Sequence, residues 1–184
     1  MIRLAFTALP LVFLLACNRG KEQAVTIVPH EVQIDETAVP GDPFGSSSPA
    51  YERLREVTDA ALASAWSGDL EDFAPWLEEQ TVAIERSRNL LKAIRTGPRD
   101  IYAVANGRIA LVYEHIALAL TDASRVAEAA GYQAEWKGQQ DLIWEQATAF
   151  WTLCVRGCGS SGTHLDAWDL RCRAGLAKSP RQPK

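Results

Sequence analysis

The residues best suited to chemistry in this 184-residue sequence are three cysteines near the C-terminus, Cys154, Cys158 and Cys172, with His164 between them. Thiolate and imidazole groups bind zinc, and a structural zinc site takes four such ligands. Cys154 and Cys158 are four residues apart and would share one face of a helix. However, the set lacks the close Cys-x-x-Cys pair of most zinc sites, which favours a structural disulfide over a metal. We therefore expect no metal and no other cofactor.

Which cysteines form the bridge is less clear from the sequence. Three thiols allow one bridge and leave one cysteine over. Cys158 lies between two glycines in a stretch typical of a loop, whereas Cys154 is in phase with apolar residues and should be buried. This difference favours Cys158–Cys172, but the geometry of an antiparallel hairpin favours Cys154–Cys172, so both pairings stay open. Either one would stabilise the fold by about 3 kcal/mol in the chain-entropy treatment.

Three tryptophans, Trp136, Trp144 and Trp151, recur at helical spacing and form a second candidate site. Their indoles could bind a flat or hydrophobic ligand. Large aromatic side chains at this spacing more often pack in a core, because each buries a large apolar area. We therefore expect core packing, with a ligand site in a Trp-lined interior as the alternative.

His115 lies beside Glu114 in the most apolar part of the sequence. Metal sites in four-helix bundles use Glu-x-x-His pairs, and the sequence contains none. A core histidine bonded to a neighbouring carboxylate is the simpler interpretation. The sequence also lacks a haem-attachment Cys-x-x-Cys-His, a His-Glu-x-x-His, a Walker loop and a Gly-x-Ser-x-Gly. No catalytic residue is assigned, and we do not expect an enzyme.

The segments that must position these residues have helical periodicity. Ser48 is a suitable N-cap, Pro49 suits the first helical turn, and Asp69 can cap the next helix. The third helix is apolar on nearly all sides, which indicates a buried element. The predicted helices are 49–66, 70–95, 99–130, 132–156 and 165–176.

These helices predict an all-α body over residues 49–177, followed by a loose basic tail over 178–184. Long helices joined by short breaks favour an up-down antiparallel bundle of four helices, with the short C-terminal helix as a lid. Helical-hairpin repeats of the tetratricopeptide type are the alternative, although no second copy of a 34-residue period is evident. The formal net charge of −4 argues against nucleic acid as a partner, because phosphate contacts need clustered Lys and Arg.

The N-terminus carries a further pattern. Arg3 precedes an apolar run of twelve residues, Leu4 to Leu15, which is too short to span a bilayer and has the length of a signal-peptide core. The run ends in Leu14-Leu15-Ala16-Cys17. Residues 17–48 are rich in proline, glycine and serine, so we expect a flexible linker between this stretch and the helices.

The stretch Leu14-Leu15-Ala16-Cys17 resembles the lipobox of bacterial lipoproteins. The resemblance implies that residues 1–16 are a signal peptide, that lipid is attached to the Cys17 thiol, and that Cys17 becomes the first residue of the mature protein. Asn18 stands where an aspartate would imply retention in the inner membrane. The resemblance therefore implies an outer-membrane protein that faces the periplasm or the cell surface. An exported compartment also permits a disulfide.

Together, the anchor and the lack of catalytic motifs predict a non-enzymatic helical lipoprotein. Its expected partners are the membrane, through lipid on Cys17, and other envelope proteins, for example those of an assembly, secretion or motility machine. One alternative is a lipoprotein that holds a hydrophobic ligand in its Trp-lined core. The other is a metal-binding or thiol-active protein that uses the C-terminal cysteine cluster.

Overall fold

A computed structural model describes residues 38–45, 48–131 and 136–179 of the chain. Contacts divide the chain into two compact units, Met1–Ile34 and Asp35–Lys184, and all described residues belong to the second. The predictions for the signal peptide 1–16, for lipid on Cys17, for the linker up to residue 37 and for the tail after residue 179 lie outside the described residues.

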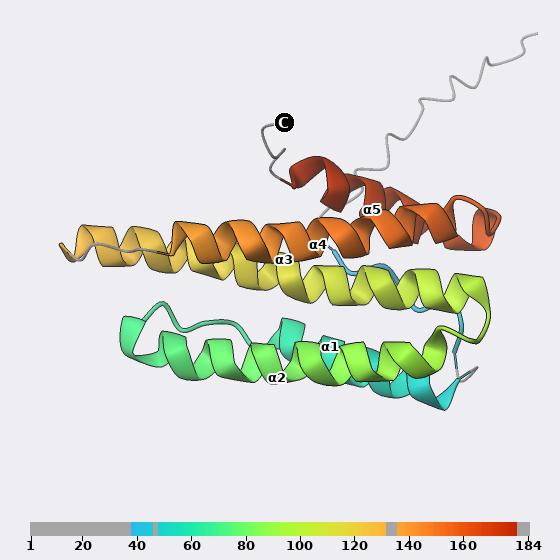
Figure 1. Ribbon diagram of the computed structural model, residues 1–184, viewed down its shortest axis with the longest axis horizontal. Helices are drawn as coiled ribbons and strands as arrows, with labels where there is room; N and C mark the ends of the chain where they lie inside the picture. Colours follow the sequence, from blue (N-terminus) through green and yellow to red (C-terminus); the bar gives the residue numbers. More distant parts are fainter. Residues whose placement is uncertain (1–37, 46–47, 132–135, 180–184) are drawn as a thin grey trace, which may run out of the picture. The chain divides into compact units, whose positions relative to one another are not determined.

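The described residues fold into helices, and no strand occurs among them. The predicted all-α class is therefore confirmed for this part of the chain. Consecutive helices run in opposite directions (Figure 1). The elements are α1 (Pro49–Ala63), α2 (Leu70–Ile94), α3 (Arg99–Ala129), α4 (Lys137–Cys158), a 3₁₀ turn (Thr163–Leu165) and α5 (Asp166–Lys178).

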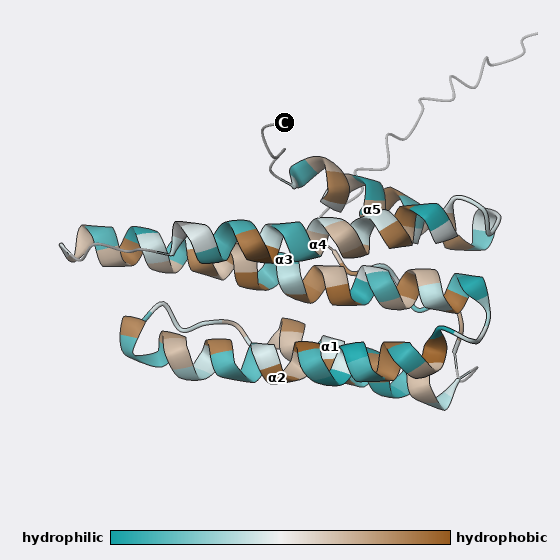
Figure 2. Cartoon of the chain, in the orientation of Figure 1, coloured by the Kyte–Doolittle hydropathy of each residue, from teal (hydrophilic) through white to brown (hydrophobic). Residues whose placement is uncertain are grey.

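The starts of α1 and α2 follow from their capping residues. The Ser48 side chain accepts a hydrogen bond from the backbone N–H of Tyr51, and the Asp69 side chain accepts one from Glu71. Each bond satisfies one of the amide groups that a helix leaves unpaired at its start. Both helices carry hydrophobic as well as hydrophilic residues along their whole length, as expected of helices with one buried face (Figure 2).

Helix α1 ends at Ala63, earlier than the predicted end at residue 66. Trp66 lies outside the helix, where its Nε1 donates to the carbonyl oxygen of Asp69 at 2.7 Å. Its ring also meets the ring of Phe73 edge-on, with the centroids 5.2 Å apart. This local hydrogen bond and aromatic contact take the place of another helical turn.

Helix α3 lies at the centre of the packing. It packs against α1 and α2 on one side and against α4 and α5 on the other (Figure 1). Over residues 103–114 buried residues occupy all its faces, including the polar Asn106, Arg108 and Glu114, so the predicted buried helix is confirmed for this part of α3. A closed up-down bundle of four helices with a lid stays a prediction.

Glycine permits the close contact between α3 and α4. A Cβ atom built on Gly157 would lie 2.3 Å from the Cβ of Ala103, closer than two carbons can approach. Helix α5 continues to Lys178, and the Ser179 hydroxyl donates to the carbonyl oxygen of Gly175. The folded body thus extends two residues beyond its predicted end at residue 177. Among the described residues, no helix combines the length and the hydropathy that a membrane crossing requires.

Candidate functional site

The three C-terminal cysteines come together as predicted, with their sulfur atoms within 4.8 Å of one another. The structure joins Cys154 to Cys172 in a disulfide with a Cα–Cα distance of 6.0 Å, and Cys158 is a free, buried thiol. The favoured pairing, Cys158–Cys172, is therefore wrong, and the alternative from hairpin geometry is confirmed.

The position of Cys158 explains why it is not part of the bridge. Glycines on both sides of it predicted a loop, but α4 continues through Gly157 because its missing side chain lets the helix pack on Ala103. Cys158 is therefore helical and 3% exposed, one turn beyond Cys154, with its Sγ 3.7 Å from the Sγ of Cys154. The antiparallel α5 places Cys172 against Cys154, the earlier of the two.

The chemistry open to this cluster is limited. Burial, with a smaller effect of the negative charge of Asp169, raises the pKa of the Cys158 thiol to about 12. At neutral pH the group is a thiol, and the thiolate is the form that attacks disulfides and binds metals. Cys154 and Cys172 offer no thiolates while they are bridged. The described cluster therefore acts as a structural staple.

The three tryptophans do not converge on one site. They are spread over about 22 Å of the axis of α4, at 1.5 Å per residue. Trp136 stacks on Phe73 with ring centroids 5.2 Å apart, whereas Trp151 is fully buried beneath the guanidinium of Arg171, 4.7 Å from its ring centroid. Trp144 is half-buried. The predicted core packing is confirmed for Trp151.

His115 has a different partner from the predicted one. Its Nε2 lies 3.1 Å from the carbonyl oxygen of Ser64, and its ring meets that of Trp76 edge-on. The neighbouring carboxylate of Glu114 points to Arg171 instead, with a 2.9 Å ion pair. The prediction of a core histidine paired with Glu114 is therefore wrong in its partner. Sequence proximity misled it because adjacent helical residues point in different directions.

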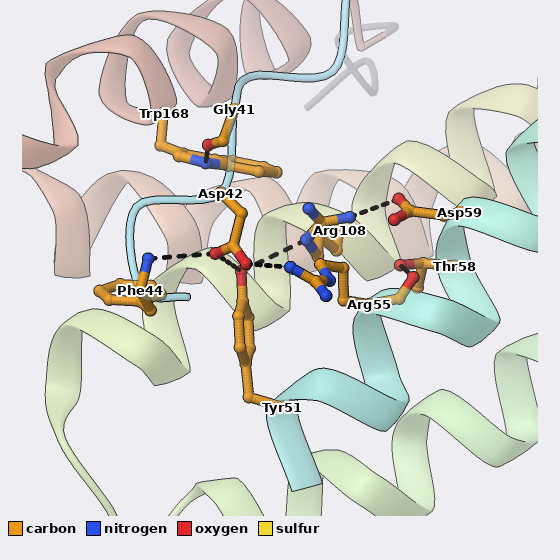
Figure 3. Close-up of polar contacts among 9 residues, drawn as sticks. All are labelled: Gly41, Asp42, Phe44, Tyr51, Arg55, Thr58, Asp59, Arg108 and Trp168. Atoms are coloured by element: carbon orange, nitrogen blue, oxygen red, sulfur yellow. Dashed lines mark hydrogen bonds and ion pairs between the residues drawn. The ribbon is translucent and has the colours of Figure 1, made fainter. Parts of the chain in front are cut away.

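A polar clamp, centred on Asp42, holds residues 41–44 and was not predicted from the sequence. Asp42 accepts hydrogen bonds from the backbone N–H of Phe44 at 3.1 Å and from the Tyr51 hydroxyl at 3.1 Å. It also forms an ion pair with Arg55. Figure 3 shows the carboxylate between these groups, with Tyr51 and Arg55 both contributed by α1.

Arg108 extends this clamp into α3. Its Nη1 donates to Asp59 at 2.6 Å, and its Nε donates to the Tyr51 hydroxyl at 3.4 Å (Figure 3). Its guanidinium also lies 5.5 Å from the ring centroid of Trp168 on α5. The indole Nε1 of Trp168 in turn donates to the carbonyl oxygen of Gly41 at 3.0 Å. The segment that enters the body is thus bonded to helices from both ends of the described sequence.

Tyr51 links the two halves of the clamp. Its pKa is raised to about 12, mainly by burial, with Arg108 lowering it and the nearby carboxylate of Asp42 raising it. The phenol therefore stays protonated, so it can donate to Asp42 and accept from Arg108 at the same time. A phenolate could not donate, and this arrangement needs the neutral form.

The predicted flexible linker extended to residue 48. The structure shows that residues 41–44 of that linker contact the body through the clamp. Pro40, Gly41 and Pro43 around Asp42 are typical of a turn, but no sequence pattern indicates where that turn docks. Arg108, within the apolar third helix, was the one sequence signal of the clamp, because a buried cation requires partners.

Comparison with protein-family models, curated proteins and solved structures finds no match to this chain.

Proposed function

We propose that this protein is a bacterial lipoprotein held at the outer membrane by lipid on Cys17. Its helical body is a non-enzymatic module, with the up-down bundle as the expected architecture, that docks other proteins of the cell envelope. The observation that carries the proposal is the stretch Leu14-Leu15-Ala16-Cys17 at the end of a twelve-residue apolar run. Each buried CH₂ of an attached lipid contributes about 0.8 kcal/mol, so several acyl chains hold a protein firmly.

The clamp gives independent support to a tethered module. A protein that is held at its N-terminus transmits any pull through the segment that enters its folded body. In this chain that segment is bonded at Gly41 and Asp42 to Trp168, Tyr51 and Arg55. A junction with contacts to α1 and α5 spreads such a load over the fold.

The disulfide also fits the proposal. Disulfides persist in oxidising compartments such as the periplasm and are rare where thiols are kept reduced. Cys154–Cys172 is a buried bridge between two helices, which suits a structural role in an exported protein.

Replacement of Cys17 by serine tests the anchor. The natural chain should fractionate with membranes, lack residues 1–16 and carry the mass of its acyl chains. The Cys17→Ser chain should keep its leader and carry no lipid. A variant that still fractionates with membranes and is cleaved as before would refute the anchor.

Asn18 offers a matched control next to the anchor. The lipobox resemblance implies that Asn18→Asp leaves the lipid in place and moves the protein to the inner membrane, whereas Asn18→Gln should not move it. The docking role is tested separately by crosslinking in intact cells. If no envelope protein is crosslinked to the body, docking is refuted and the anchor stands on its own result.

A further inference from the structure

An open groove of about 710 Å³ lies between α1 and α2. Its apolar lining combines small side chains from both helices, and Ala60 and Val82 in it are exposed to solvent. A volume of this size is typical of a binding site rather than of a packing defect. The apolar residues along it are Val57, Ala60, Ala61, Pro75, Val82 and Ala83.

The charged residues of the groove are mainly acidic. Glu56, Glu78 and Glu79 line it together with one basic residue, Arg86. All three glutamates are exposed, and none of them forms an ion pair with another described residue. The three glutamates and Arg86 therefore give the groove a formal net charge of −2.

Gln80 provides a second and independent observation. Its side chain lines the groove and is 1% exposed, and its Nε2 donates to the carbonyl oxygen of Ala61 at 3.2 Å. Its Oε1 is buried and has no partner among the described residues. A buried amide oxygen without a donor is costly, and a ligand that supplies an N–H would satisfy it.

The shape of the groove favours a helix as its occupant. Two antiparallel helices with small residues between them present a seat for a third, which is the helix-in-groove mode of recognition. The lining residues of α2 run from Pro75 to Arg86, about 17 Å of helix at 1.5 Å per residue. That length matches about three turns of a bound helix.

We propose that this groove binds an amphipathic helix of a partner protein, which places small apolar side chains on the groove's alanines and lysine or arginine on Glu56, Glu78 and Glu79. The inference names the kind of partner that the docking role requires, and it rests on that role. The charge of the groove selects a basic helix over an acidic one, since the glutamates would repel the acidic one.

The test uses the full chain and a defined probe. The probe is a fluorescent 14-residue amidated peptide with a leucine and alanine face flanked by four lysines, compared with the same peptide carrying four glutamates. The lysine peptide should bind at least tenfold more tightly in fluorescence anisotropy at low salt. The triple variant Glu56→Gln, Glu78→Gln, Glu79→Gln should weaken binding at least fivefold.

Two further variants separate the groove from general acidity. Ala60→Trp fills the groove from an exposed position, so it should weaken binding at least fivefold while leaving the thermal unfolding midpoint unchanged. The control neutralises three exposed acids that do not line the groove, Glu128→Gln on α3 and Asp141→Asn and Glu145→Gln on α4, and should change binding less than twofold. Equal losses in the two triple variants would overturn the proposal.

Three other results would also overturn it. They are equal binding of the two peptides, full binding by Ala60→Trp, and self-association of the chain that the groove variants abolish, which would make the occupant a second copy. None of these results bears on the Cys17→Ser fractionation. Failure of the groove and failure of the anchor are therefore distinguishable.

Discussion

The indole Nε1 of Trp168 donates a hydrogen bond to the carbonyl oxygen of Gly41, 3.0 Å away, although 127 positions separate the two residues. Trp168 is 1% exposed, so the bond satisfies a buried donor. It ties the segment that enters the body to the last helix. The position of this segment is thus set by tertiary contacts, and removal of a single donor should loosen it.

Trp168→Phe tests this relationship. The variant keeps an aromatic ring in the core and removes the N–H, which leaves the Gly41 carbonyl without its donor. We expect a loss of about 1–3 kcal/mol in the free energy of unfolding, from the hydrogen bond and the smaller ring. Denaturant unfolding measures the loss, and limited proteolysis should show faster cleavage around residues 38–45.

Trp144→Phe is the matched control. It removes the same atoms from a half-buried tryptophan that makes no side-chain hydrogen bond among the described residues. Its cleavage pattern around residues 38–45 should equal that of the natural chain. If Trp168→Phe also leaves the pattern unchanged, the segment is not held through this bond.

The cysteine pairing predicts unequal effects of two substitutions. Cys172→Ala breaks a bridge that spans 18 positions, and we expect the free energy of unfolding to fall by about 3 kcal/mol. Cys158→Ala keeps the bridge and removes one buried thiol. Its cost should be about 1 kcal/mol. Chemical unfolding under non-reducing conditions compares the two.

Thiol counting checks the same assignment without a stability measurement. The mature chain with its lipid should contain one free thiol, and this thiol should react only after denaturation because Cys158 is 3% exposed. Two bridged cysteines in a Cys158→Ala chain would support the assignment. A free thiol at position 154 or 172 in the natural chain would contradict it.

The buried thiol also predicts a dependence of stability on pH. Burial raises the pKa of Cys158 from 9.0 to about 12, so the unfolded chain ionises first as the pH rises. Ionisation of Cys158 therefore leaves the free energy of unfolding unchanged below pH 9 and lowers it progressively between pH 9 and 12. Between pH 8 and 10 the natural chain should lose about 1 kcal/mol more than Cys158→Ala. Equal pH profiles for the two chains would refute the raised pKa.

Local chemistry made the helices predictable. Ser48 and Asp69 begin helices as N-caps, and Gly97 with Pro98 separates α2 from α3. These signals act within a few residues, so a sequence displays them directly. The buried character of the first two thirds of α3 was predictable for the same reason, since its composition there leaves little polar face.

Contacts between distant residues were not predictable in this way. Gly157 was expected to end the helix, but its packing on Ala103 outweighs the low helix propensity of glycine. Helix α4 therefore continues to Cys158, and Cys172 forms its bridge with Cys154. No periodicity connects Asp42 with Tyr51 or Gly41 with Trp168, because such bonds depend on how the helices pack. The clamp was therefore found only in the structure.

A buried ion pair couples α3 to α5 and gives the strongest stability prediction. Glu114 and Arg171 are joined at 2.9 Å with side chains 7% and 4% exposed, and the guanidinium also lies over Trp151. Removal of one charge leaves the other buried without compensation, which costs about 3–5 kcal/mol. We therefore expect Glu114→Gln to destabilise the fold strongly in denaturant unfolding. The exposed pair Asp122–Arg125 serves as the control, and Asp122→Asn should cost less than about 1 kcal/mol.

The double variant Glu114→Gln, Arg171→Met separates the charge effect from lost packing. Because neither charge remains, it should be more stable than the sum of the two single losses implies, by about 1–3 kcal/mol of coupling energy. The Nε and Nη1 groups of Arg171 have no partner among the described residues, so methionine also removes two unsatisfied donors. Additive losses in the cycle, or a Glu114→Gln cost equal to that of Asp122→Asn, would show that the pair contributes no more than an ordinary surface contact.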